Sequence, residues 1–118
     1  PKSMPISLLQ TLDIIEAMEG FIDKKRPPEH IRHQVDLSYN IEDQSIFIVE
    51  IRPNWKNPEL KIECPIAKTT FVKAKNQWKV FWMRGNGNWV PYTPQATVES
   101  LSEFLNLVVE DKHHCFWG

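Results

Sequence analysis

Aromatic rings and cations alternate in one stretch of the chain, QWKVFWMRGNGNWVPY, which holds three of the five tryptophans. From residue 65 to residue 98 there are five cations and no acid, although the whole chain has a net charge of −1. A sheet face with rings between cations can stack the bases of single-stranded nucleic acid and contact its phosphates. The residues that we expect at such a ligand surface are Lys73, Trp78, Lys79, Arg84, Trp89 and Tyr92.

The same rings could instead fill the core of a small domain, with the cations extending from its margin. We favour the core for Val80, Phe81 and Trp82. Both interpretations stay open for Trp89 beside Arg84, because an exposed cation–π pair and a ligand platform need the same arrangement.

The Asn86-Gly87 pair predicts a two-residue type I′ turn, which would place Arg84 opposite Trp89 in a hairpin. A similar turn at residues 75–76 would place Phe71 opposite Val80. The expected faces are Phe71, Trp78, Val80, Trp82 and Trp89 on one side, and Val72, Phe81, Met83, Val90 and Tyr92 with Lys68 and Lys79 on the other.

Two carboxylates and an amine suggest a different function, the metal-dependent hydrolysis of nucleic acid. Asp36 and Glu50, on successive predicted strands, would hold magnesium, and Lys68 on the next strand would supply the amine. Arg52 stands where such a motif would have lysine, and a guanidinium cannot act as a base because it stays protonated. A nuclease-like hydrolase is therefore the alternative to a binding module.

Histidines and cysteines provide a third set of candidates, His30, His33, Cys64, His113, His114 and Cys115. Their spacing matches no zinc signature, so we expect no metal and no cofactor. We interpret them as surface histidines and two buried, reduced thiols.

Hydrophobic periodicity predicts the elements that must position these residues. Residues 7–25 follow helical spacing, capped by Ser7, with a wide stripe that should pack against a sheet. The stripe consists of Leu8, Leu12, Ile15, Met18 and Ile22, and Ile14 and Phe21 widen it. Strands are expected at 34–41, 45–52, 65–74, 77–84 and 88–92, the last at an edge because Pro91 cannot donate to a ladder. A second helix at 98–109, capped by Thr97, would precede a docked tail containing Phe116 and Trp117.

The predicted order α-β-β-β-β-β-α corresponds to an α+β fold, an antiparallel sheet of about five strands with N-terminal and C-terminal helices. A chain of 118 residues with 42% hydrophobic and 25% charged residues favours one globular domain over residues 1–118. The balanced charge argues against a dedicated duplex-DNA binder. Because no apolar run could span a bilayer and no secretory signal is recognised, we expect a cytoplasmic protein without a membrane partner.

Several stretches, VEIRPNW, PIAKTTFVK, WKVFWMR, NWVPY and CFWG, resemble a family of small bacterial proteins known as the domain of unknown function DUF3024. The resemblance covers about residues 39–118, and departs from the family in the GNGN turn and the histidine pair at 113–114. The residues that match are Glu50, Arg52, Pro53, Trp55, Lys68, Lys73, Trp78, Trp82, Arg84, Trp89, Tyr92, Asp111 and Cys115. The resemblance implies a cohesive bacterial domain and assigns no chemistry.

The sequence therefore predicts a non-enzymatic binding module with an aromatic and basic sheet edge. Its expected partner is single-stranded nucleic acid. A protein partner, or a second copy of the chain paired across the edge strand, is the open alternative.

Overall fold

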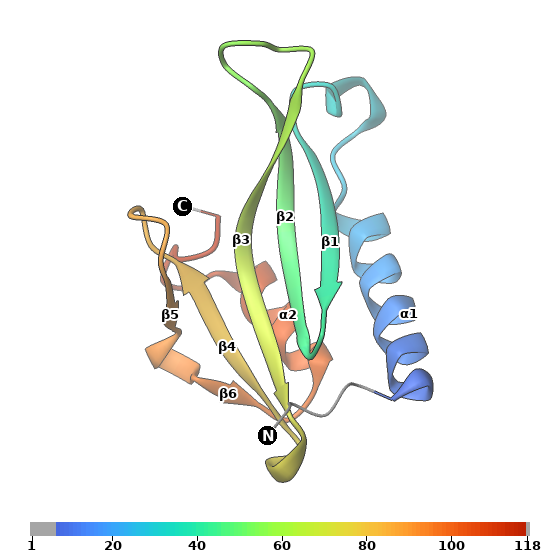
Figure 1. Ribbon diagram of the computed structural model, residues 1–118, viewed down its shortest axis with the longest axis vertical. Coiled ribbons are helices and arrows are strands. Elements are labelled where there is room, and N and C mark those ends of the chain that lie inside the picture. The colour runs from blue at the N-terminus through green and yellow to red at the C-terminus, as the bar shows by residue number, and fades with distance from the viewer. Residues whose placement is uncertain (1–6, 118) are drawn as a thin grey trace.

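Two helices and a six-stranded antiparallel sheet make up the structure, a computed structural model that describes residues 7–117 (Figure 1). The elements are α1 (Leu8–Lys25), β1 (Asp36–Glu42), β2 (Ser45–Pro53), β3 (Lys61–Val72), β4 (Gln77–Met83), β5 (Trp89–Pro91), β6 (Thr97–Val98) and α2 (Leu101–Glu110). Short 3-10 turns η1 (Glu29–Ile31), η2 (Lys73–Lys75) and η3 (Thr93–Gln95) lie in the connections. This order confirms the predicted α+β fold. None of the helices in residues 7–117 is long and apolar enough to cross a membrane.

Strands β1 to β5 lie side by side in chain order, each antiparallel to the next. The two-residue strand β6 also pairs with β4, so β5 and β6 share the outer edge of the sheet. Pro91 ends β5 and the η3 turn separates the two short strands. The predicted edge position of the strand containing Pro91 is confirmed.

The C-terminal helix begins later than predicted. Thr97 lies in β6 rather than capping a helix, and α2 starts at Leu101. Ser100 is the N-cap, since its hydroxyl oxygen accepts a hydrogen bond from the backbone N–H of Glu103 at 3.2 Å. The prediction was wrong because β4 still has open backbone groups at this point, and pairing of Trp78 with Val98 satisfies them as a strand.

Helix α1 begins as predicted and buries part of the predicted stripe. Ser7 accepts a hydrogen bond from the N–H of Gln10, which confirms it as the N-cap. The buried residues are Ile14, Met18 and Phe21. Three other residues of the stripe, nearer the start of the helix, are exposed: Leu8 at 75%, Leu12 at 54% and Ile15 at 38%. A stripe around half of a helix holds more apolar residues than one line of contact can bury.

The β3–β4 connection is longer than predicted. The η2 turn and Asn76, with a left-handed φ of +50°, replace a two-residue turn. Phe71 consequently lies opposite Trp78 instead of Val80. A shift by two residues leaves every side chain on its expected face, because faces alternate with each residue.

The β4–β5 hairpin changes the assignment of faces. Its loop has three residues, 85 to 87, because the N–H of Arg84 donates to the carbonyl of Asn88 at 2.9 Å. Within this loop only Gly87 has a positive φ, +85°, whereas a type I′ turn also needs a positive φ at Asn86. Met83, not Arg84, therefore lies opposite Trp89. This one-residue shift moves Trp89 to the face opposite the one predicted and brings Tyr92 into the core.

Both helices pack on one face of the sheet. Figure 1 shows α2 behind the sheet and α1 next to β1, with the front face free of helices. The core between helices and sheet contains Ile14, Met18, Phe21, Leu37, Ile46, Ile48, Ala67, Phe71, Trp78, Val80, Tyr92, Val98, Phe104, Val108 and Phe116. The other face, which we call the open face, carries Phe47, Lys68, Phe81, Met83 and Trp89.

The tail after α2 is docked, as predicted. Asp111 is buried and takes a left-handed φ of +41°. Its carboxylate accepts hydrogen bonds from the backbone N–H groups of Phe116 at 3.1 Å and Trp117 at 3.0 Å. Phe116 is consequently buried against Tyr92, with ring centroids 5.0 Å apart.

Candidate functional site

Lys68 lies at the centre of the open face between two aromatic rings. It pairs directly with Phe47 on β2 and with Phe81 on β4. The three side chains therefore form a row across three neighbouring strands, since paired residues share a face. The Lys68 ammonium lies 5.5 Å from the centroid of the Phe47 ring and 5.1 Å from that of Phe81.

Trp89 completes the cluster from the edge of the sheet. Its indole centroid lies 5.9 Å from the Lys68 Nζ and 5.9 Å from the centroid of the Phe47 ring. Strands lie about 4.8 Å apart, so the backbones of β5 and β2 are separated by roughly 14 Å. Two large side chains span that distance only by leaning toward one another over Lys68. We call Phe47, Lys68, Phe81 and Trp89 the Lys68 cluster.

Ring electrons, and not a carboxylate, stabilise the charge of Lys68. Among the residues that the structure describes, no acid forms an ion pair with it. Cation–π contacts contribute about 0.5–1 kcal/mol each when exposed and more when desolvated. All three aromatic side chains are half-buried, so parts of the rings remain accessible to a ligand.

Two further cations lie near this cluster. Lys79 is exposed and pairs with Thr70 on one side and with Thr97 on the other, which places it on the open face. Arg84 is exposed where β4 enters the hairpin loop. Lys73 is exposed in the η2 turn beyond the end of β3.

The structure divides the ligand residues predicted from the sequence. Trp89, Lys79 and Arg84 lie on or beside the open face, whereas Trp78 is 5% exposed and Tyr92 2% exposed in the core. Burial raises the pKa of the Tyr92 hydroxyl, in keeping with that position. Trp78 and Tyr92 therefore cannot form part of a surface. The physical reason is the side-chain alternation of β4 and the one-residue shift of the hairpin.

Three members of the Lys68 cluster, Phe47, Lys68 and Phe81, were not predicted as ligand residues. Phe47 belongs to a strand, SIFIVEIR, whose apolar residues on both faces predict only a central position. Lys68 and Phe81 were placed on the same face in the sequence analysis, but a core position was favoured for Phe81. The sequence did contain a signal for Phe81. Successive residues of a strand face opposite sides, so if Val80 faces the helices, Phe81 must face away from them.

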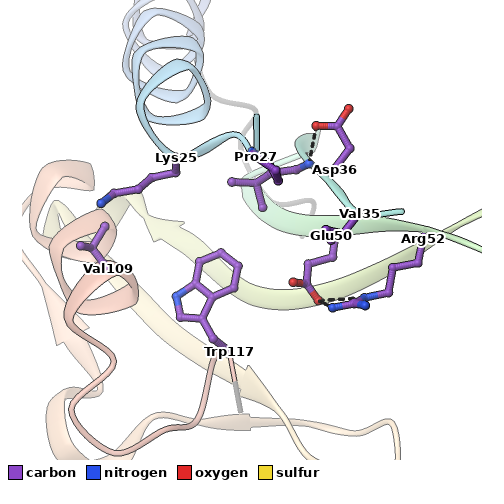
Figure 2. Close-up of a pocket in the computed structure, with 9 residues that line it drawn as sticks. Lys25, Pro27, Val35, Asp36, Glu50, Arg52, Val109 and Trp117 are labelled. Atoms are coloured by element: carbon purple, nitrogen blue, oxygen red, sulfur yellow. Dashed lines mark hydrogen bonds and ion pairs between the residues drawn. The ribbon is translucent and has the colours of Figure 1, made fainter. Parts of the chain in front are cut away.

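A second candidate site, a pocket, lies on the helical side at the C-terminal end of α1 (Figure 2). Its volume is about 370 Å³. The end of α1, the β1–β2 hairpin, the end of α2 and the C-terminal tail enclose it. The lining residues are Lys25, Pro27, Val35, Asp36, Leu37, Glu50, Arg52, Val109 and Trp117.

The structure does not bring the proposed nuclease residues together. Glu50 lines the pocket on the helical side, whereas Lys68 lies among rings on the open face. Asp36 is engaged by Arg26 in two hydrogen bonds of 2.8 Å, and this pairing holds the pKa of its carboxyl below the usual value. Figure 2 shows the Asp36 carboxylate directed away from that of Glu50. The geometry does not favour a shared magnesium site.

The histidines and cysteines do not converge either. Within residues 7–117, no three side chains of His, Cys, Asp or Glu lie close enough to hold a metal ion. Cys64 and Cys115 are free thiols. Burial, followed by the nearby Asp111 carboxylate, raises the pKa of the Cys115 thiol, which keeps it in the unreactive protonated form at neutral pH.

The architecture and the open face define a small α+β protein with a one-sided sheet and a lysine held among aromatic rings. The chain belongs to the family described as a domain of unknown function, DUF3024, whose model matches residues 6–118. This match confirms the resemblance seen in the sequence and extends it over α1. No curated protein and no solved structure matches the chain.

Proposed function

We propose that this protein is a non-enzymatic binding module and that the open face of its sheet binds single-stranded nucleic acid. The Lys68 cluster is the observation that carries the proposal. Phe47, Phe81 and Trp89 gather around an ammonium that has no carboxylate partner among the described residues. Aromatic rings beside cations are the surface on which bases stack without sequence preference.

The charges around the cluster support a polyanion as the ligand. Lys79 is exposed on the open face, Arg84 is exposed where β4 enters the hairpin loop, and residues 65–98 contain no acid. A ligand strand could thus stack on Trp89 while its phosphates contact the two cations. The acids of the chain lie outside this segment. The carboxylate of Glu63 accepts a hydrogen bond at 3.1 Å from Asn40, which pairs with Phe47, so a nucleic acid would meet least repulsion at the Trp89 end of the cluster.

Anisotropy of a labelled oligothymidine, titrated with the protein at several salt concentrations, tests the proposal. We expect saturable binding at low salt that weakens as salt increases. Contacts from Lys79 and Arg84 to two phosphates predict a slope of about −1.4 in log K against log salt. Trp89→Ala should cost about 1–3 kcal/mol of binding free energy, the contribution of one stacked base, and leave the slope unchanged. Lys79→Ala should reduce the slope to about half.

Lys56→Ala is the matched control. Lys56 lies 5.1 Å from the centroid of the Trp55 ring, which makes it a second exposed cation–π pair, located in the β2–β3 loop. Binding should not change in this variant. A flat titration of the wild-type protein at low salt would remove nucleic acid as the ligand, and attention would turn to a protein partner or a second copy of the chain.

A further inference from the structure

The pocket on the helical side has the size and lining of a small-molecule site. Its volume of about 370 Å³ lies within the usual range for ligand pockets, about 300–1,000 Å³. Apolar groups from four separate segments form its walls: Pro27, Leu37, Val109 and Trp117. It lies on the opposite side of the sheet from the Lys68 cluster, so its ligand is independent of the function proposed above.

Trp117 forms a wall that is held in place. The indole N–H donates to the carbonyl of Val108 at 2.7 Å, and the backbone N–H donates to the Asp111 carboxylate at 3.0 Å. The side chain is nevertheless 40% exposed. Because its only polar hydrogen is already bonded, the indole can offer a ligand only its ring surface. Ring surfaces attract apolar groups and cations.

Glu50 supplies a carboxylate that is half satisfied. Two nitrogens of Arg52, Nε at 3.3 Å and Nη2 at 3.2 Å, donate to the same oxygen of Glu50, Oε1. The second oxygen, Oε2, accepts no hydrogen bond from any described residue. In Figure 2 the carboxylate faces Trp117 across the pocket. The Glu50 side chain is 22% exposed and that of Arg52 is 50% exposed, so solvent screens the guanidinium more than the carboxylate.

Two further charged residues that line the pocket, Asp36 and Lys25, limit the number of ammonium groups that a ligand can carry. Asp36 is already paired with Arg26. Figure 2 shows the Lys25 ammonium beyond Trp117, on the side away from Glu50. A ligand with one ammonium at Glu50 avoids Lys25, whereas a ligand with a second ammonium at its other end would be repelled there.

We propose that this pocket binds an organic monoamine, with its ammonium at Glu50 Oε2 and its apolar body on the ring of Trp117. An ammonium donates to the free carboxylate oxygen in a charge-assisted hydrogen bond. The apolar part covers the indole and the walls at Pro27, Leu37 and Val109. The same chemistry is found in free amines and in the lysine side chain of a peptide.

Titration of the ¹⁵N-labelled protein with phenethylamine, followed by the indole N–H resonance of Trp117, tests the proposal. Its neutral isostere, 2-phenylethanol, should bind about tenfold more weakly or worse, because it lacks the charge-assisted bond. A diamine of similar length should also bind more weakly than phenethylamine. N-acetyl-lysine-methylamide, titrated in parallel, distinguishes a peptide lysine from a free amine as the preferred source. Equal binding of phenethylamine and 2-phenylethanol, or binding of neither, would overturn the proposal.

Two pairs of variants sharpen the result. Glu50→Gln keeps an acceptor for Arg52 and should abolish the preference for the amine, while Glu63→Gln, an exposed acid on β3, should not. Lys25→Ala should strengthen binding of the diamine by removing the repulsion of its second ammonium, while Lys24→Ala, which does not line this pocket, should have no effect. A diamine that binds no more tightly to Lys25→Ala than to the wild-type protein would contradict the assigned orientation. A failed oligonucleotide titration would not bear on these outcomes.

Discussion

The indole of Trp89 on β5 and the ring of Phe47 on β2 lie with their centroids 5.9 Å apart, although two strands separate them in the sheet. The contact is possible because both side chains project from the open face and lean over Lys68. It places residues 42 positions apart in one cluster. Which residues meet on this face therefore depends on the register of every strand between them, and most directly on the hairpin loop that precedes Trp89.

Gly87 should be the residue of that loop that tolerates substitution least. Its φ of +85° is strained for any residue with a Cβ, although no atom lies within 4 Å of the place a Cβ would take. Gly87→Ala should therefore destabilise the protein by about 1 kcal/mol through the backbone alone. Urea denaturation measures the loss. Gly85→Ala, in equally open space and without a positive φ, is the control and should be neutral or slightly stabilising.

Ser100, rather than Thr97, should carry the N-terminal cap of α2. Ser100→Ala removes the acceptor for the N–H of Glu103 and should cost about 1 kcal/mol of the free energy of unfolding. Thr97→Ala removes an exposed side chain of β6 and should cost less. Thermal or urea unfolding of the two variants decides between them. A larger loss in Thr97→Ala would mean that the helix starts where the sequence pattern placed it.

Asp111 should control the order of the C-terminal tail. Asp111→Asn keeps one acceptor oxygen and tolerates the left-handed backbone, but it loses the second acceptor and the charge. We expect the tail to open more often and carboxypeptidase to remove Trp117 faster than in the wild-type protein. Glu110→Gln is the control, since its carboxylate only pairs with Lys112 on the surface at 3.5 Å. Equal digestion rates in the two variants would contradict the role of Asp111.

The two tyrosines should titrate at high pH. Burial, together with a 2.6 Å hydrogen bond to Glu19, raises the pKa of Tyr39 to about 12. A raised pKa in the folded state stabilises the protein below the unfolded value near 10, and this stabilisation is lost as the pH rises through about 12. The absorbance of tyrosinate at 295 nm follows the titration directly. Tyr39→Phe should remove this component and leave that of Tyr92, whose pKa burial also raises.

Periodicity in the sequence was sufficient for the element types and their order. The helix cap at Ser7, the first strand, the edge position of Pro91 and the docking of Phe116 followed from local patterns and are confirmed. The part of the α1 stripe that is buried did not follow. Packing against the sheet and α2 determines which residues of the stripe are buried, namely Ile14, Met18 and Phe21. The helical pattern alone holds no information on that packing.

The composition of the candidate surface could not be predicted because it depends on a one-residue difference in the length of the β4–β5 loop. Asn86-Gly87 is the strongest short hairpin signal, yet the chain places only Gly87 in the left-handed region and uses a three-residue loop. The resulting shift decides the positions of Trp89 and Tyr92. The pocket at Trp117 could not be predicted for a different reason, because its lining comes from the ends of four elements that are remote in the chain. A local sequence pattern carries no information on which remote segments lie close together in the fold.

The three-residue loop at 85–87 makes the count of residues, rather than their identity, the determinant of the open face. Removing a single codon there would turn Trp89 toward the helices and Val90 toward solvent without replacing one side chain. Insertion or deletion of one codon in this loop is therefore enough to form or disrupt the Lys68 cluster, even though none of its aromatic residues is substituted.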